Sequence, residues 1–213
     1  MDAFEHVVAT MLFQSGYWVT QGFKVDLTPD EKAAIGRTTT PRWELDLVAY
    51  RGRDKHFLVV ECKSYLDSTG VQAKEVIATD AHKSRYKLFV DPILRRVVFN
   101  RLSIQMSEIG LIPPDLTPQL GLAVGKYKNT KDKVAIENHF QLNSWILLSP
   151  EWIVHRLHEI SNQSYFDSVA HVVSKLITRN NVEQTGAVNP HAFGTFVTDP
   201  AGAGSAPKAS GDT

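Results

Sequence analysis

The sequence lacks several features that would place it in a special class. Its 213 residues include one cysteine, so no disulfide framework can form within one chain, and a single free thiol fits a reducing compartment. Basic and acidic residues number 23 each, which argues against a uniformly basic nucleic-acid binder but not against a local basic cleft. No apolar run approaches the roughly 20 residues that span a bilayer, and an acidic residue at position 2 argues against a signal peptide. We therefore expect a cytoplasmic protein without a membrane segment.

Two apolar segments around a polar turn dominate what is present. Residues 43–50 and 56–62 are rich in Val, Leu, Phe, Trp and Tyr, and the sequence Arg-Gly-Arg-Asp lies between them, so the pattern predicts a β-hairpin. A two-residue turn at 52–53 and a four-residue turn at 51–54 give the same register. That register puts Asp46 opposite Val59 and Glu61 diagonal to Asp46. A turn of odd length would put the two carboxylates on opposite faces.

Charged residues interrupt this apolar hairpin. Side chains alternate between the faces of a strand, so Asp46 shares a face with Val48, and Glu61 and Lys63 share a face with Val59. A charge on a packed face is costly unless it is paired or bound to a metal, and two close carboxylates repel each other. Mg²⁺ suits such a pair, because it takes a few carboxylate oxygens and keeps waters, one of which can attack a phosphodiester. A neighbouring lysine can orient that water or stabilise the developing negative charge.

These residues carry a resemblance to a known family. Asp46, followed by Glu61-Cys62-Lys63 on the next strand, resembles the motif of the PD-(D/E)xK nuclease superfamily, which has the restriction-endonuclease-like fold. The likeness covers about residues 1–130 and is nearest the methyl-directed restriction and Holliday-junction-resolvase-like branches. The literal Pro-Asp pair is missing, because the proline lies five residues before the aspartate.

The resemblance implies a role for each motif residue. The implied catalytic residues are Asp46, Glu61 and Lys63. The implied ligands of Mg²⁺, or of Mn²⁺ in its place, are Asp46, Glu61, the Cys62 carbonyl and Glu5 on a leading helix. For Glu5, a solvated acid in the first turn of the helix is an equally good interpretation.

The function implied by the resemblance is that of a metal-dependent endonuclease that hydrolyses DNA, preferentially double-stranded, in restriction, repair or mobile-element defence. A homodimer fits this interpretation, because many members cut two strands with two copies. Two alternatives stay open. The chain can be a catalytically silent nuclease-fold module for nucleic-acid binding or protein assembly, or an α/β protein of another activity. A Glu and a Lys two residues apart commonly form a solvated pair on a strand, so the triplet alone is a weak signal.

The whole pattern predicts an α/β protein with a restriction-endonuclease-like mixed central sheet, flanking helices and an α-rich C-terminal part. We expect residues 1–130 to form the core and residues 131–180 to complete the same domain. Residues 181–213 are expected to be a flexible tail, since Gly, Pro, Ala, Ser and Thr bury too little apolar surface. Predicted helices span 3–16, 71–90, 93–109, 131–142, 149–160 and 165–177, and further strands span 17–27, 120–127 and 145–148. Thr28 and Ser149 are predicted helix caps.

Basic residues gather in two segments of this neutral chain. Residues 80–101 carry a net charge of +4, and residues 126–133 carry a net charge of +3. Both segments contain aromatic residues. Such clusters are candidate phosphate contacts, although each is equally compatible with an ordinary solvated face. The candidate nucleic-acid-binding residues are Lys83, Arg85, Lys87, Arg95, Arg96, Lys126 and Lys128.

Overall fold

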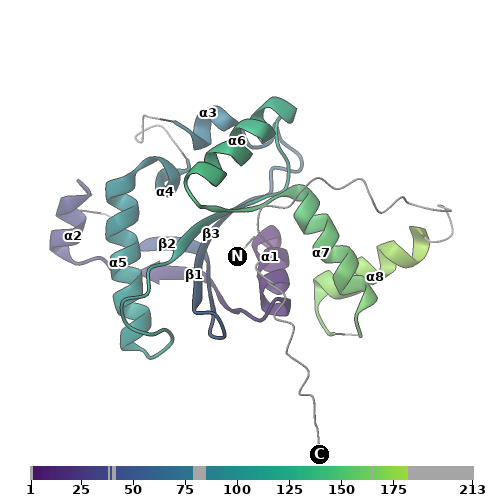
Figure 1. Ribbon diagram of the computed structural model, residues 1–213, viewed down its shortest axis with the longest axis horizontal. Coiled ribbons are helices and arrows are strands. Elements are labelled where there is room, and N and C mark those ends of the chain that lie inside the picture. The colour runs from purple at the N-terminus through teal and green to yellow at the C-terminus, as the bar shows by residue number, and fades with distance from the viewer. Residues whose placement is uncertain (1, 38, 40–41, 79–84, 165, 182–213) are drawn as a thin grey trace, which may run out of the picture.

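A five-stranded mixed sheet forms the centre of the molecule (Figure 1). The computed structural model describes residues 2–37, 39, 42–78, 85–164 and 166–181. Strands β1, β2 and β3 form an antiparallel meander, and β4 and β5 extend the sheet in parallel beyond β3. In their order across the sheet the strands are β1 (Trp18–Val25), β2 (Trp43–Arg51), β3 (His56–Lys63), β4 (Gln119–Val124) and β5 (Ile146–Leu148). The predicted α/β class with a mixed sheet is confirmed.

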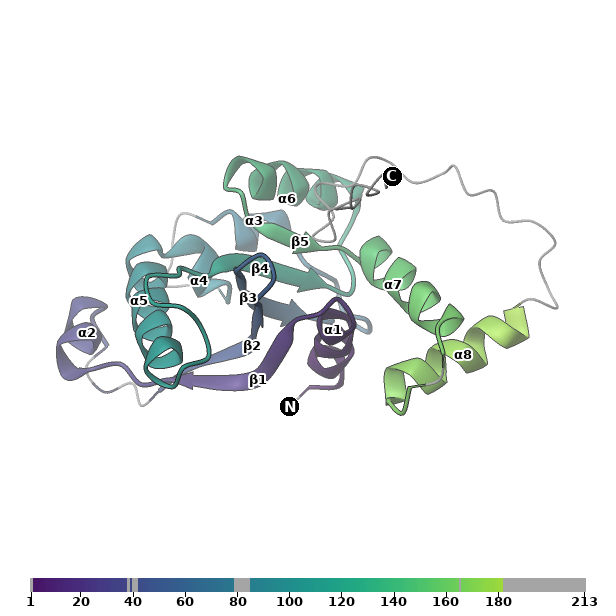
Figure 2. The ribbon, with the colours of Figure 1, turned by 60° about the horizontal axis from the view of Figure 1, so that its bottom comes forward.

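Helices cover both faces of the sheet (Figures 1 and 2). On one face, α4, α5 and α6 bury the larger hydrophobic core against the strands, and on the other face α1 and α7 bury a smaller one. Among the described residues, no helix is long and apolar enough to cross a membrane. The helices are α1 (Ala3–Gln14), α2 (Pro29–Ala34), α3 (Ala73–Val76), α4 (Lys87–Val90), α5 (Pro92–Glu108), α6 (Thr130–Leu142), α7 (Pro150–Asn162) and α8 (Val169–Asn181).

Helix starts follow the capping chemistry of the sequence. The Thr28 hydroxyl accepts the Glu31 amide at 3.3 Å, and the Ser149 hydroxyl accepts the Trp152 amide at 3.2 Å, so both predicted caps are confirmed. The predicted start of the last helix is four residues too early. Ser168 accepts the His171 amide at 3.2 Å, and α8 begins just after this serine.

The prediction of one helix over residues 71–90 is wrong. The described part of this stretch contains only two short helices, α3 and α4, and residues 79–84 lie outside the described residues. Its first residue, Val71, pairs in parallel with Tyr127 as an isolated β-bridge. The Val71 amide donates to the Lys126 carbonyl at 2.9 Å, and this extended pairing prevents a helix from starting there.

The hairpin register differs from the predicted one by two residues. Val48, and not Asp46, lies opposite Val59. The turn is the four-residue loop 52–55, because Arg51 belongs to the strand, where its side chain is buried and pairs with Asp54 at 2.6 Å. The shift is by an even number of residues, so within the paired part of the hairpin the side chains lie on the predicted faces. Asp46 and Glu61 lie just beyond the last pair, Leu47 and Val60.

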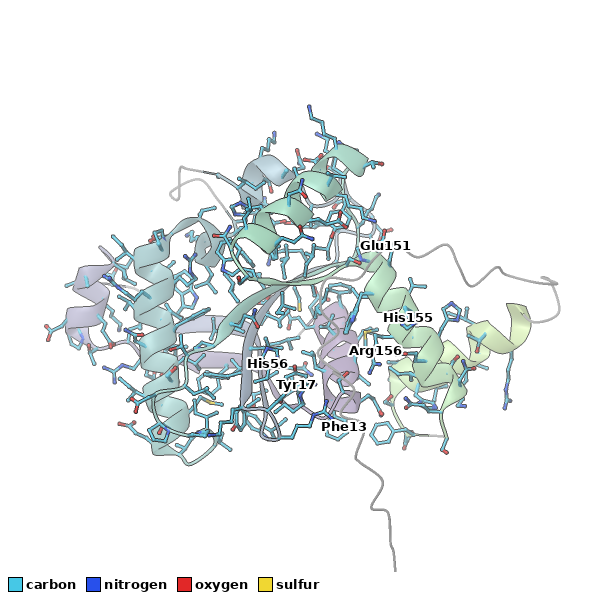
Figure 3. All side chains as sticks on the ribbon, in the orientation of Figure 1. Phe13, Tyr17, His56, Glu151, His155 and Arg156 are labelled. Atoms are coloured by element: carbon cyan, nitrogen blue, oxygen red, sulfur yellow. The ribbon has the colours of Figure 1, made fainter. Side chains whose placement is uncertain are left out.

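The loop end of the hairpin is fixed by a buried polar contact at α1. Tyr17, just after α1, has its hydroxyl against Nδ1 of His56, and Nε2 of His56 lies 2.9 Å from Oε1 of Gln119 in β4 (Figure 3). Burial raises the pKa of Tyr17 to about 12, so this hydroxyl keeps its proton at neutral pH. The Arg51 guanidinium covers the Tyr17 ring at 4.4 Å. These contacts hold the hairpin in one register.

At its other end the hairpin opens. Pairing between β2 and β3 stops at Leu47 and Val60, although both strands continue, β2 against β1 and β3 against β4. Leu45 packs in the larger core together with Val48, whereas Leu47 packs in the smaller core. The regular alternation of faces is therefore interrupted at the residue between Leu45 and Leu47, which is Asp46. The open fork places the Asp46 carboxylate between the two strands.

The loop after β3 is held close to the segment after β4. The Gly125 amide donates to the Lys63 carbonyl at 2.9 Å, and a Cβ atom at Gly125 would lie 2.3 Å from the Ser64 carbonyl oxygen. At Gly70, where φ is +90°, a Cβ atom would lie 2.6 Å from the Tyr127 carbonyl carbon. Only glycine permits the two backbones to approach this closely.

We predict that Gly125→Ala destabilises the protein by about 1–3 kcal/mol, because the added methyl group meets a backbone carbonyl that cannot turn away. Chemical denaturation measures the change. The matched control is Gly52→Ala, where the nearest atom to a new Cβ is a side-chain carbon 3.9 Å away. Equal unfolding midpoints for the two variants would contradict this account of the loop.

Candidate active site

A lysine and two carboxylates meet at the open end of the hairpin. Lys63 Nζ lies 2.7 Å from Glu61 Oε1 and 3.8 Å from Asp46 Oδ2. The three side chains are between 19% and 24% exposed, so water reaches them from one side only. The residues that the sequence predicted to act together are therefore in contact, although they belong to different strands.

Two of these side chains, Asp46 and Lys63, line an open cleft of about 320 Å³, and Glu61 lies behind them, bound to Lys63. The cleft has three acidic residues and two basic ones in its lining. The lining residues are Asp2, Glu5, Asp46, Cys62, Lys63, Ser64, Tyr65 and Arg85. The cleft is therefore built from the start of α1, the fork of the hairpin, the loop after β3 and the residue that precedes Tyr86.

Burial and charge act in opposite directions on the central ion pair. Burial is the main reason that the pKa of Glu61 is raised; the Asp46 charge raises it further, whereas Lys63 lowers it. Burial, the largest single effect, lowers the pKa of Lys63, but the charge and hydrogen bond of Glu61 together with the charge of Asp46 outweigh it, so this pKa is raised. Lys63 is thus a permanent cation at neutral pH, while Glu61 is a carboxylate held in an environment that favours its neutral form. A further cation beside Glu61 would relieve that cost.

Cys62 contributes through its backbone. Its amide donates to Asp46 Oδ2 at 2.7 Å, across the fork. Because the Lys63 carbonyl accepts a bond from the β4 side, the alternation of a strand directs both the amide and the carbonyl of Cys62 toward β2. The ladder partner that β2 would have supplied is absent there, since β2–β3 pairing ends at Val60. The Cys62 carbonyl and the Asp46 carboxylate therefore face the same fork. Burial is the first cause of the raised pKa of the Cys62 thiol, which stays protonated and inert.

Glu5 caps the first helix and also lines the cleft. It belongs to a capping box at the start of α1. There the Asp2 side chain accepts a hydrogen bond from the Phe4 amide at 2.9 Å, and the Glu5 side chain accepts one from the Asp2 amide at 3.4 Å. It also lines the cleft. Burial raises its pKa, and so does the charge of Asp46, which shows that these two carboxylates feel each other.

The side-chain donors here are few. Among the described residues, no group of three or more His, Cys, Asp or Glu side chains is close enough together to hold a metal ion. Glu5, Asp46 and Glu61 therefore do not form a ready-made three-side-chain site. Two carboxylates and a carbonyl remain at the fork, and the described residues offer no hydrogen bond to Asp46 Oδ1 or Glu61 Oε2.

The predicted basic residues are spread over several parts of the molecule. Among the described residues, Arg85 is the only one of the predicted nucleic-acid contacts that lines the cleft. Arg95 is used inside the fold, where its Nη1 donates to the Leu88 carbonyl at 2.7 Å and its guanidinium covers the Trp145 ring at 5.1 Å.

The other basic candidates lie elsewhere or outside the described residues. Lys126 Nζ donates to the Ser68 carbonyl at 2.9 Å, and Lys128 Nζ donates to Gln72 Oε1 at 3.2 Å, so both tie the loop after β3 to the segment after β4. Lys87 lies in α4 and Arg96 is exposed on α5, whereas Lys83 lies outside the described residues.

Sequence reasoning missed three residues of the cleft. Asp2, Ser64 and Tyr65 line it but carry no motif. Position next to the Glu-Cys-Lys triplet could have indicated Ser64 and Tyr65, because residues that follow a strand stay near its end. Asp2 could have been found from the capping pattern that it forms with Glu5.

Comparisons with known proteins leave the chain without an assigned family. No protein-family model matches the sequence. Neither a curated protein nor a solved structure is significantly similar to it. The function therefore has to be argued from the residues of the cleft.

We predict that Glu61 makes the metal-free protein less stable as the pH rises. Its folded pKa lies above the ordinary 4.5, so the folded state binds an extra proton between pH 4.5 and that raised pKa. Stability from this proton is present at low pH and is lost as the pH rises through the folded pKa, with a slope of at most about 1.4 kcal/mol per pH unit.

The measurement compares the free energy of unfolding of wild type and Glu61→Gln in chelator between pH 4.5 and 8. Burial lowers the pKa of His139, which titrates in the same range with the opposite sign but cancels in the difference. We expect wild type to lose stability relative to Glu61→Gln as the pH rises. A difference independent of pH would contradict the desolvation of Glu61.

Proposed function

We propose that this protein is a metal-dependent endonuclease that hydrolyses phosphodiester bonds of DNA, with Asp46, Glu61 and Lys63 as its catalytic residues. The observation that carries the proposal is that Lys63 lies within 2.7–3.8 Å of both carboxylates, and that Lys63 and Asp46 line one cleft. A restriction-endonuclease-like fold is part of the proposal. The meander of three antiparallel strands, with parallel strands beyond it, supports it.

The donors at the fork fit Mg²⁺ or Mn²⁺. Magnesium prefers oxygen ligands and keeps several waters, so it does not need a complete cage of protein side chains. The residues that would hold it are Asp46, Glu61 and, through its carbonyl, Cys62. Glu5 lies at the same cleft and is the candidate for a further, water-mediated contact. When bound, such an ion supplies an activated water and neutralises charge on the phosphate.

The residues of the chain divide the remaining work. Lys63 is positioned by two carboxylates and stays protonated, so it acts as a hydrogen-bond donor and a positive charge and not as a base. It can orient the attacking water or stabilise the negative charge that develops on the phosphate. Asp46 is held by the Cys62 amide through one oxygen, which leaves its second oxygen to bind a metal ion. Arg85, which also lines the cleft, offers a second cation for a phosphate oxygen.

A second candidate function rests on a specific observation. Lys63 pairs with Glu61 and approaches Asp46, so ion pairs hold the triad together without any metal. This arrangement suits a catalytically silent module for nucleic-acid binding or protein assembly. The excess of one negative charge in the triad favours the metal-dependent enzyme, since a bound cation would balance it. A metal titration separates the two candidates.

We predict that wild type cuts supercoiled and linear DNA with Mg²⁺ or Mn²⁺, and that Asp46→Ala and Lys63→Ala each lower the rate at least on the order of 10²-fold. The physical reason is the loss of a metal ligand in the first variant and of the cation beside the phosphate in the second. Gel-based cleavage time courses measure the rates, and chelator is expected to stop the wild-type reaction.

Matched controls come from β1 and the residue that follows it. Asp26→Ala removes an exposed carboxylate that pairs with Arg42 just after β1, and Lys24→Ala removes an exposed lysine within β1. Both variants should cut like wild type. If wild type binds no metal and cuts no DNA, the silent module is the correct function, whereas cutting that survives Asp46→Ala would place the catalytic site elsewhere.

We also predict that Arg85→Gln weakens DNA binding about equally for all sequences and lowers the slope of log affinity against log salt by about 1. Arg85 is exposed and lines the cleft, so its loss should leave the unfolding midpoint unchanged. Fluorescence anisotropy in Ca²⁺ at several salt concentrations measures the slope. The control is Arg53→Gln in the hairpin loop, at the far end of the strands. Identical salt slopes for wild type and Arg85→Gln would rule out a phosphate contact by Arg85.

A further inference from the structure

Tyr65 has a backbone conformation that is rare for a bulky residue. Its φ angle is +44°, in the left-handed region that an L-residue with a Cβ atom disfavours. Three other described non-glycine residues have a positive φ, namely Lys55, Asp115 and Ser144, and these are polar residues of ordinary turns and helix ends. Tyr65 is the one aromatic residue of this group, and it alone among the four lines the cleft.

The surroundings of Tyr65 hold it in this conformation. On one side, the Ser64 carbonyl lies against Gly125 so closely that only glycine fits there. On the other side, the Tyr65 carbonyl accepts the Ser68 amide at 3.2 Å, and the Ser68 carbonyl accepts Lys126 Nζ at 2.9 Å. A strained residue persists only where its neighbours determine its position, and such residues cluster at functional sites.

The side chain of Tyr65 connects the core to the cleft. Its ring packs against the larger hydrophobic core, and the fully buried Tyr86 is its neighbour there. Burial is the main reason that the pKa of Tyr86 is raised, and the nearby Tyr65 raises it further. Tyr65 also lines the cleft together with Lys63, which lies two residues earlier in the chain. The proton of the Tyr65 hydroxyl can then be donated to a group in the cleft.

We propose that Tyr65 is a substrate-binding residue whose hydroxyl donates a hydrogen bond to the phosphate that occupies the cleft between Lys63 and Arg85. This inference rests on the proposed nuclease function, because it assigns a further contact to the same substrate. The strained loop fixes the ring, so the hydroxyl is presented without a large loss of side-chain entropy on binding. The cleft would then hold its phosphate by three donors, namely Lys63, Tyr65 and Arg85.

The test is Tyr65→Phe in the 213-residue chain, which removes only the hydroxyl and keeps the ring and the backbone. We expect kcat/KM for DNA cleavage in Mg²⁺ to fall about 10- to 100-fold, the range for a hydrogen bond to a charged group. The affinity for uncut duplex in Ca²⁺ should fall by a similar factor, because the bond already forms in the bound substrate. The thermal unfolding midpoint should stay unchanged.

The matched control is Tyr50→Phe. Tyr50 lies in β2 near the hairpin loop, where its ring packs edge-on against Phe57 and its hydroxyl does not line the cleft. A second variant, Tyr65→Asn, keeps a residue type that tolerates the left-handed conformation. It should lose at least as much affinity as Tyr65→Phe.

Each outcome decides the question. If wild type cuts DNA and Tyr65→Phe cuts and binds like Tyr50→Phe, the proposal for Tyr65 is wrong while the nuclease function stands. Loss of activity together with a lower unfolding midpoint would mean that the hydroxyl supports the loop and not the substrate, which also overturns it. If wild type neither binds nor cuts DNA, the proposed function and this inference both fail.

Discussion

The arrangement of the cleft depends on one electrostatic constraint, the placement of a lysine ammonium between two carboxylates where a hairpin opens. Asp46 and Glu61 can both lie near this ammonium because its positive charge reduces their mutual repulsion. The same proximity keeps Lys63 charged despite its partial burial. Pairing between β2 and β3 stops beside this cluster, where the Cys62 amide donates to the Asp46 carboxylate and not to a β2 carbonyl.

The chemical types of the site residues could be predicted from the sequence better than their arrangement in space. The types of residue at Asp46, Glu61 and Lys63 and their place at one end of a hairpin were sufficient to expect a shared site, although the alternation of faces is interrupted at Asp46. The register itself could not be predicted, since it depends on Arg51. In sequence this arginine is part of a polar turn, but the fold buries it over the Tyr17 ring, and that packing is visible only in three dimensions.

Long helices with clear caps were also predictable, as α5, α6 and α7 show. The helix predictions that were wrong concern stretches whose conformation is determined by segments distant in the sequence. Val71 is extended because its backbone forms hydrogen bonds with Lys126 and Lys128. These two residues follow β4, more than 50 residues later in the chain. Tyr65 belongs to the same class. Nothing in its own neighbourhood in the sequence signals a left-handed backbone, which arises from the close approach of Gly125.

The order of the strands also bears on how the chain assembles during synthesis. The three proposed catalytic residues lie in β2 and β3. These strands are synthesised well before β4, which begins at Gln119. Leu122 of β4 pairs beside Glu61, so the backbone at Glu61 gains this neighbour only when β4 docks. That docking is a parallel pairing across a long connection and hence a slow step in folding. The strand that carries Glu61 and Lys63 therefore gains its second partner late.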